Sequence, residues 1–284
     1  MTSLLLAGGR RLDLAAPAVM GVLNVTPDSF SDGGRHHLLD DALRAAEAML
    51  AAGAVFIDVG GESTRPGAAA VSAEEELRRV LPVVRALVAR GALVSLDSSK
   101  PEVIRPCLDA GAHLVNDVRA LGLPGALQAV AAGDAAVCLM HMQGDPASMQ
   151  RDPHYGDVVT EVGGFLAARV AACVAAGIRR DRLLIDPGFG FGKTLHHNLA
   201  LLRGLPQVAE LAGGLPVLAG LSRKSMIGAL TGRPVGERLA GGLALAIAAV
   251  EGGARIIRSH DVAETVDALK VWQAFRGAGP AGEG

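Results

Sequence analysis

Short apolar runs recur along the chain, and each of them stops at a polar residue or a glycine. Eight such runs end as VLN at Asn24, IDVGG at Asp58–Gly61, VSLD at Asp97, LVND at Asn116–Asp117, CLMH at His141, LLIDPG at Asp186, VLAG at Gly220 and IIRSH at Arg258–His260. Helix-like stretches separate the runs, a pattern typical of buried parallel strands in repeated βα units. Eight units in a chain of 284 residues predict one α/β domain, a single (β/α)8 TIM barrel, with its chemistry at the carboxyl ends of the strands.

Helix signals fill the gaps between these runs. Ser72 and Glu75 have the spacing of a capping box in front of an apolar stripe of helical period. Asp261 and Glu264 repeat that spacing at the start of the last helix. The gap between the third and fourth strands has room only for a short helix, which we place at 102–109.

Two connections at the predicted barrel mouth are rich in Gly, Pro and Ser. Residues 26–37 (TPDSFSDGGRHH) follow the first strand, and residues 62–71 (ESTRPGAAAV) follow the second. Because long polar loops in this position tend to bind or cover ligands, we predict long mobile loops after strands 1 and 2. The barrel should span 1–276, and the remaining GAGPAGEG at 277–284 should form a disordered tail because it has nothing to pack.

Composition narrows the class of protein. The formal net charge is −2 and aromatic residues make up 3% of the chain, so no nucleic-acid partner is expected. Three widely spaced cysteines without a CxxC pair favour buried thiols in a reducing compartment. The start MTSLLLAGGRR lacks the features of a signal peptide, and the apolar run 243–250 is too short to span a bilayer. We expect a soluble, cytoplasmic protein with no membrane partner.

Three strand ends bring polar oxygens to the predicted mouth. Asp97, Asn116 and Asp186 would face a region of low dielectric constant, where unpaired charge is costly. A planar heterocycle with several N–H groups would satisfy all three together. The alternative for each residue is structural, in which it caps the following helix or fixes a loop.

The segment DPGFGFGK at 186–193 invites comparison with a phosphate-binding loop. It fails that comparison, because a Walker loop requires glycine where this chain has Pro187, and the glycine spacing also misses the dinucleotide pattern. We interpret the glycines as a tight turn that lets the backbone and Phe189 or Phe191 approach a ligand, although a purely structural turn has the same composition.

Cationic residues after the last two strands indicate an anion site. Arg258 and His260 are two apart in an extended run, so both point to the same side, near the start of the last helix. The eighth strand end is a common anion site in such barrels, and a pyrophosphate would suit it. Lys224 in SRKS could donate as a cation, form a Schiff base, or remain a solvated loop lysine.

The histidines offer little for a metal. The pairs at 36–37 and 196–197 are adjacent and lack the spacing of zinc ligands, and His141 fits packing as well as function. Mg²⁺ is the metal that the sequence favours, because it needs only one or two protein oxygens besides substrate phosphates and water. Asn24 could supply one of these oxygens.

With these segments assembled, the chain resembles the dihydropteroate synthase family, the folate-pathway enzymes targeted by sulfonamides. The motifs that carry the resemblance follow the family's order and cover nearly the whole barrel: MGVLNVTPDSFSDGG, IDVGGESTRPGA, DSSKPEVI, GAHLVNDVRA, CLMHMQG, LLIDPGFGFGK, GLSRKSMIG and IIRSHDVAET. Two departures are minor. DSSK has Ser98 where the family often has threonine, and IIRSH has Ser259 where an apolar residue is common.

The resemblance implies a transferase that condenses (7,8-dihydropterin-6-yl)methyl diphosphate with 4-aminobenzoate to give 7,8-dihydropteroate and pyrophosphate. It assigns the pterin and diphosphate site to Thr64, Asp97, Asn116, Met140, Asp186, Gly220, Lys224, Arg258 and His260. It assigns the aminobenzoate pocket to Phe30, Pro66, Phe191 and Ser222. The resemblance also implies Mg²⁺ on Asn24, catalytic roles for Lys224, Asp186, Asp97, Asp32 and Arg65, and a homodimer.

Three other interpretations stay open. A related pterin-binding barrel that transfers a methyl group from a folate could share the acidic pocket, but it would not need Arg258 and His260. A non-catalytic pterin-binding barrel is possible, although every expected site residue is present. A Schiff-base aldolase acting through Lys224 is the third.

Overall fold

The computed structural model describes residues 3–26, 35–63, 70–145 and 148–277. Its centre is a closed barrel of parallel strands in the order β10-β3-β4-β5-β6-β7-β8-β9. These strands are β3 (Ala18–Asn24), β4 (Phe56–Gly60), β5 (Leu93–Asp97), β6 (Leu114–Asp117), β7 (Ala136–Met140), β8 (Leu183–Asp186), β9 (Val217–Gly220) and β10 (Ala254–Ser259). Each predicted apolar run forms one of them, so the (β/α)8 barrel is confirmed.

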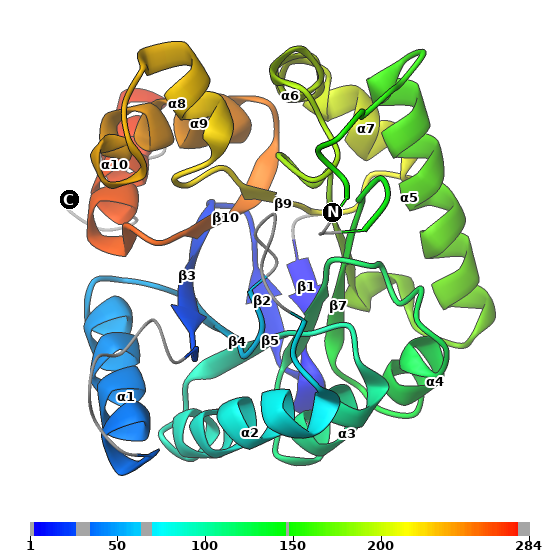
Figure 1. The fold of residues 1–284 in the computed structure, drawn as a ribbon, viewed down its shortest axis with the longest axis vertical. Coiled ribbons are helices and arrows are strands. Elements are labelled where there is room, and N and C mark those ends of the chain that lie inside the picture. Colours follow the sequence, from blue (N-terminus) through cyan, green and yellow to red (C-terminus); the bar gives the residue numbers. More distant parts are fainter. Residues whose placement is uncertain (1–2, 27–34, 64–69, 146–147, 278–284) are drawn as a thin grey trace.

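Helices follow the strands and surround the barrel (Figure 1). The α-helices are α1 (Arg35–Ala51), α2 (Ala73–Ala89), α3 (Pro101–Asp109), α4 (Ala126–Ala131), α5 (Val158–Ala175), α6 (Leu195–Arg203), α7 (Leu205–Leu211), α8 (Ser225–Thr231), α9 (Leu239–Glu251) and α10 (Val262–Phe275). Short 3₁₀ turns are η1 (Ala7–Gly9), η3 (Arg180–Arg182) and η4 (Val235–Glu237). Helix α3 confirms the short helix expected between the third and fourth barrel strands.

Side chains along the barrel strands alternate between two apolar layers. Met20 and Phe56 belong to the cluster inside the barrel, whereas Val19 and Ile57 belong to the larger cluster between strands and helices. The inward-facing positions become polar toward the carboxyl ends of the strands. The alternation therefore delivers these polar residues to the barrel mouth.

An N-terminal hairpin fills the opposite end of the barrel. Strand β1 (Ser3–Leu5) pairs antiparallel with β2 (Arg11–Asp13). Leu4, Leu6 and Leu14 are fully buried and join the apolar cluster inside the barrel. The sequence pattern did not predict this hairpin, because three-residue strands are too short to show a period.

The two predicted capping boxes have different outcomes. Ser72 accepts a hydrogen bond from the backbone N of Glu75 at 3.2 Å, as expected for the start of α2. Asp261 precedes α10 but makes no side-chain capping bond; its carboxylate accepts instead from Arg223 and Ser222. The prediction for Asp261 is wrong, because a guanidinium is a stronger donor to a carboxylate than a backbone N–H.

By length and composition alone, one described helix, α5, could cross a membrane. Its residues Val162, Leu166 and Val170 are buried in the cluster around the barrel, and the helix packs against β7, α6 and α7. Core helices pass the same test, so this feature does not argue for a membrane. Parts of the two predicted mouth loops, 27–34 and 64–69, and the tail from 278 lie outside the described residues.

Candidate active site at the barrel mouth

The last inward-facing residues of the strands form a ring at the barrel mouth. In the order in which the strands neighbour one another, they are Asn24, Gly60, Asp97, Asn116, Met140, Asp186, Gly220 and Arg258. Seven of these eight were predicted as site residues, the exception being Gly60. They come from every strand of the barrel, which is why residues far apart in sequence meet here.

A half-buried arginine joins two carboxylates on one side of the ring, in a group that we call the arginine cluster (Asp58, Asp97, Asn116 and Arg258). Arg258 Nε donates to Asp58 Oδ2 at 2.6 Å, and its Nη2 donates to Asp97 Oδ2 at 2.7 Å. Asn116 Nδ2 donates to the same oxygen of Asp58 at 3.1 Å. One carboxylate oxygen therefore orients both an arginine and an amide of the predicted site.

Asp58 is the site residue that sequence reasoning missed. It is fully buried, and it lies one inward-facing position below Gly60 on β4. Its Oδ1 and the Oγ of Ser95 are the buried side-chain atoms without a hydrogen-bond partner among the described residues, and the two residues are register neighbours. A charged residue within the apolar run FIDVG was the available signal, because an unpaired charge there would be too costly.

Burial and mutual attraction shift the pKa values of this cluster. Burial raises the pKa of Asp97 to about 7, with the Arg258 charge opposing the rise and the Asp58 charge adding to it. Burial lowers the pKa of Arg258, but the charges of Asp58 and Asp97 outweigh that effect and hold the pKa above its usual range. Arg258 is therefore a fixed cation, and Asp97 changes charge near neutral pH.

A second charged group lies across the mouth, and we call it the lysine cluster (Asp186, Lys193 and Lys224, with the ring of Phe191). Asp186 Oδ1 accepts from the backbone N of Gly188 at 2.7 Å. Burial raises the pKa of Asp186, while that hydrogen bond and the Lys224 charge act to lower it. Lys224 Nζ lies 4.2 Å from the centre of the Phe191 ring, within range of a cation–π interaction.

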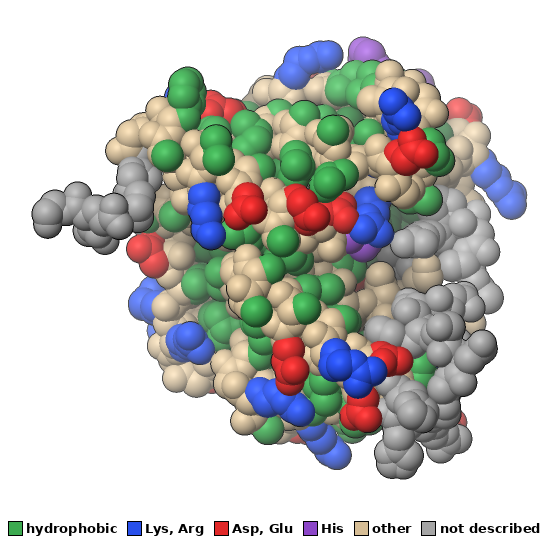
Figure 2. Space-filling view, turned by 90° about the vertical axis from the view of Figure 1, so that its left-hand side faces the viewer, with side chains coloured by type: hydrophobic (Ala, Val, Ile, Leu, Met, Phe, Trp, Pro, Cys, Tyr) green, Lys and Arg blue, Asp and Glu red, His purple; other side chains and the backbone are tan. Residues whose placement is uncertain are grey.

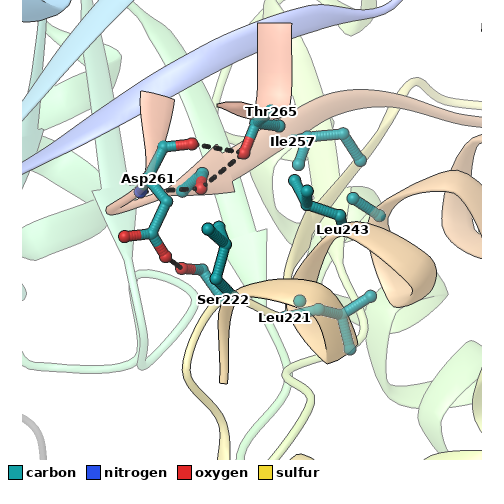
Figure 3. A pocket seen from close by; sticks show the side chains of 10 residues that line it. Leu221, Ser222, Leu243, Ile257, Asp261 and Thr265 are labelled. Atoms are coloured by element: carbon teal, nitrogen blue, oxygen red, sulfur yellow. Dashed lines mark hydrogen bonds between the residues drawn. The ribbon is translucent and has the colours of Figure 1, made fainter. Parts of the chain in front are cut away.

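His260 is held beside the eighth strand end by Ser222. Ser222 Oγ lies 3.2 Å from both the backbone N and the Nδ1 of His260. It also donates to Asp261 Oδ2 at 3.5 Å, and Figure 3 shows these two side chains facing each other beside a small, largely apolar cavity. The predicted anion-binding histidine thus has a fixed orientation.

A lysine that was not predicted ties together the two ends of the second mouth loop. Lys100 Nζ donates to Glu62 Oε2 at 2.8 Å, to Glu76 Oε2 at 2.6 Å and to the carbonyl of Val71 at 2.7 Å. Glu62 Oε1 accepts from the backbone N of Val71 at 2.8 Å. Burial lowers the pKa of Lys100, but its bonds to the two glutamates outweigh burial and raise it.

Five predicted residues lie outside the described residues, so their roles stay predictions. They are Phe30, Asp32, Thr64, Arg65 and Pro66. Asn24 is described as the half-buried last residue of β3. Within the described part of the chain, no group of three or more His, Cys, Asp or Glu side chains could hold a metal ion.

Comparisons with known proteins agree with this geometry. The model of the family described as "Pterin binding enzyme" matches residues 20–260. The chain is 56% identical over 271 residues to the dihydropteroate synthase of Escherichia coli K12, which covers 95% of both chains. It is similar to a Xanthomonas albilineans dihydropteroate synthase solved with 4-aminobenzoic acid (TM-score 0.90, 53% identity, covering 97% of this chain and 98% of that one).

A Burkholderia cenocepacia dihydropteroate synthase complexed with 7,8-dihydropteroate is also similar (TM-score 0.89, 49% identity, covering 98% of this chain and 97% of that one). These matches extend over essentially the whole barrel rather than over one motif. The resemblance seen in the sequence is thereby confirmed: the chain belongs to the pterin-binding enzyme family, among the dihydropteroate synthases.

Proposed function

We propose that the chain condenses (7,8-dihydropterin-6-yl)methyl diphosphate with 4-aminobenzoate, forming 7,8-dihydropteroate and pyrophosphate. The observation that carries this proposal is the ring of strand ends, in which buried acceptors and fixed cations lie in one mouth. Relatives with the same fold are described with 4-aminobenzoic acid and with 7,8-dihydropteroate. In the proposed reaction, 4-aminobenzoate is a substrate and 7,8-dihydropteroate is the product.

The acceptors of the ring suit the pterin. Asp97 and Asp186 can accept N–H groups of the heterocycle, and Asn116 can both donate and accept. Asp186 is buried and only 12% of the Asp97 side chain is exposed, so both carboxylates act on the ring in a medium that screens charge weakly. Their negative charge would hold electron density in the pterin while a positive charge develops on its methylene group.

The cations of the mouth suit the leaving diphosphate. Arg258 uses Nε and Nη2 on carboxylates, and its Nη1 carries two further N–H groups that can donate to a phosphate. His260 would supply another donor, with its ring held by Ser222. The diphosphate then leaves first, and the weakly basic arylamine attacks the resulting cation, so no covalent enzyme intermediate is needed.

The residues at the mouth fit a Mg²⁺ ion bound together with the substrate. Asn24 offers a hard oxygen donor at the end of β3, and Mg²⁺ commonly takes one or two protein oxygens alongside substrate phosphates. When bound, the ion would neutralise charge on the departing diphosphate. Arg65 and Thr64 would act on the same diphosphate from the second loop, whose two ends Lys100 ties together.

The aminobenzoate would lie between the lysine cluster and the first two loops. Phe191 belongs to the lysine cluster in the described chain. Phe30 and Pro66 would complete an apolar pocket, and Asp32 would approach the reacting methylene. Exclusion of water by these loops would protect the cation from hydrolysis.

We also propose a homodimer formed through the face that carries α8, η4, the start of α9 and α10. Large apolar side chains are exposed there, at Leu230, Val235 and Leu239, and most strongly at Val271 and Phe275, which are 71% and 84% exposed. Figure 2 shows apolar side chains on this side of the molecule. Light scattering should give twice the chain mass, and Val271→Glu with Phe275→Glu should give the single-chain mass; a dimer that survives both changes would exclude this face.

A cytoplasmic location is part of the proposal. The cysteines Cys107, Cys138 and Cys173 are free and buried, and burial raises the pKa of each thiol. Such inert thiols suit a reducing compartment. Fractionation of cells that express the untagged chain should recover it with soluble cytoplasmic markers, and recovery with membranes would contradict this location.

Product analysis tests the proposed reaction. Pterin diphosphate, 4-aminobenzoate and Mg²⁺ should yield dihydropteroate and pyrophosphate in equal amounts. Pterin binding without either product would favour a non-catalytic barrel or a folate methyltransferase relative. Trapping of a substrate on Lys224 by borohydride would instead favour the Schiff-base alternative.

A further inference from the structure

Lys193 is a buried ammonium at the end of the glycine-rich loop between β8 and α6. Only 3% of the residue is exposed. Its Nζ lies 2.9 Å from each of three acceptors, namely His141 Nδ1, the carbonyl of Gly188 and the carbonyl of Phe191. Burial lowers the pKa of Lys193 to about 7. An ammonium has three N–H groups, however, so three acceptors at one distance match the full donor capacity of the protonated form and favour it.

The partner histidine is fixed as an acceptor. Burial, with the Lys193 charge as the second cause, lowers the pKa of His141 to about 3. The ring is therefore neutral at neutral pH, and Nδ1 accepts from Lys193 while the proton lies on Nε2. His141 directly follows β7, so Lys193 links the loop after β7 to the loop after β8.

The two linked loops are in close contact. A Cβ on Gly188, which has a φ of +69°, would lie 1.9 Å from the carbonyl O of His141. A Cβ on Gly192 would lie 2.5 Å from the carbonyl O of Gln143, and Tyr155 donates to the Gly192 carbonyl at 2.9 Å. The loop after β8 is therefore packed tightly against the loop after β7, and the Lys193 side chain lies between them.

The loop held in this way presents Phe191 to the mouth. Lys193 binds the Phe191 carbonyl directly, and the ring of Phe191 lies under the Lys224 ammonium. A residue that fixes the Phe191 backbone also fixes the face of the pocket proposed for the arylamine. The pterin acceptor Asp186 belongs to strand β8 and meets the loop through one hydrogen bond, from the backbone N of Gly188. Its position should therefore depend less on Lys193 than that of Phe191, which lies within the loop.

We infer that Lys193 is a positioning residue for the arylamine substrate, acting through the carbonyls of Gly188 and Phe191 without touching either substrate. This inference rests on the proposed function, because it assigns Phe191 to the 4-aminobenzoate pocket. It assigns a role in the reaction to a lysine that sequence reasoning considered only as part of a turn.

The first test removes the ammonium but keeps the aliphatic chain. Lys193→Met should raise KM for 4-aminobenzoate about tenfold, the scale of losing hydrogen bonds to a charged donor, with a smaller change in KM for the pterin diphosphate. Arg105→Met removes an exposed cation on α3 and should leave both constants unchanged. Equal increases for the two substrates, or a lowered melting temperature with both constants unchanged, would overturn the inference.

A second pair of variants tests the link without touching Lys193. In His141→Asn the amide oxygen can replace Nδ1 as acceptor, whereas His141→Leu removes it. The asparagine variant should keep KM for 4-aminobenzoate within about threefold of the wild type, and the leucine variant should raise it about tenfold. Two variants with the same KM would contradict the link. Absence of product from the wild type would instead refute the proposed function, so the two failures are distinguishable.

Discussion

The arginine cluster and the lysine cluster solve the same problem, buried charge at a barrel mouth, in opposite ways. In the arginine cluster two carboxylates share one guanidinium, and burial raises the pKa of Asp97 to about 7. In the lysine cluster one carboxylate lies near two ammonium groups, and burial lowers the pKa of Lys193 to about 7. Carboxylates therefore outnumber cations in the arginine cluster, and cations outnumber carboxylates in the lysine cluster. The pterin, whose proposed acceptors Asp97 and Asp186 belong to different clusters, would lie between the two.

The difference shows how the mouth can bind an electron-rich heterocycle and release an anion. Side-chain charges hold the arginine cluster together, so its geometry depends on keeping each partner. Backbone carbonyls and N–H groups hold much of the lysine cluster, so its geometry depends on the glycine-rich loop. Substitutions should therefore damage stability in the first cluster and substrate-specific kinetics in the second.

Removing the Asp58 carboxylate should have the largest effect of the predicted changes, and the effect should be on stability. Asp58→Ala leaves Arg258 with one carboxylate and Asn116 without its acceptor, so we expect the free energy of unfolding to fall by about 3–5 kcal/mol. Glu47→Ala breaks the exposed Arg90–Glu47 pair on the surface and should cost about 0.5 kcal/mol. Urea unfolding of both variants measures this contrast, and equal losses would mean that the arginine cluster contributes no more than a surface ion pair.

The second-largest effect should be the loss of turnover when Asp186 or Lys224 of the lysine cluster is replaced. Asp186→Asn or Lys224→Ala should reduce turnover by roughly 100-fold or more, the scale of losing one preorganised electrostatic group. Arg105→Ala, at an exposed position of α3, is the control and should retain wild-type turnover. Near-normal turnover in both site variants would remove the roles given to Asp186 and Lys224.

The pH dependence of pterin binding tests Asp97. Because its folded pKa is raised to about 7, the carboxylate accepts N–H groups above that pH and becomes protonated below it. The affinity for a pterin should weaken as the pH falls through 7, approaching about tenfold per pH unit. Calorimetric titration should show this slope in the wild type, and Asp97→Asn should bind weakly without it; the same slope in both would assign the titration to another group.

Replacing Ser222 should have the smallest effect of the predicted changes, and the effect should be on KM. Loss of one neutral hydrogen bond is worth about 1 kcal/mol, so Ser222→Ala should raise KM for the pterin diphosphate about fivefold by releasing His260. Steady-state kinetics with both substrates checks this expectation. A rise confined to 4-aminobenzoate would instead place Ser222 in the arylamine pocket, as the sequence resemblance implied.

Sequence patterns predicted the barrel and most of the ring because parallel strands bring their carboxyl ends together. Asp97, Asn116, Asp186 and Arg258 each stood at the end of an apolar run, and the fold alone makes such residues meet. Lys193 was read only as part of a turn, because the pattern does not show that three acceptors from two loops surround its ammonium.

The hydrogen-bond partners of the site residues were harder to predict than their positions in the barrel. Asp58 stands in an apolar run, but its partners Arg258 and Asn116 belong to strands two places away from β4 in the barrel and far from it in sequence. Asp261 had the right spacing for a cap, yet Arg223 competes for its carboxylate. These contacts depend on long-range packing, which spacing along the chain does not encode.

The central claim is that the carboxylates and cations gathered at the mouth allow the diphosphate to leave before the arylamine attacks. Exchange of radiolabelled pyrophosphate into the pterin diphosphate, with Mg²⁺ but without 4-aminobenzoate, tests this order directly. We predict that label enters the pterin diphosphate in the wild type and that Asp186→Asn abolishes the exchange. Exchange that requires 4-aminobenzoate would contradict the claim, because bond breaking would then depend on attack by the amine.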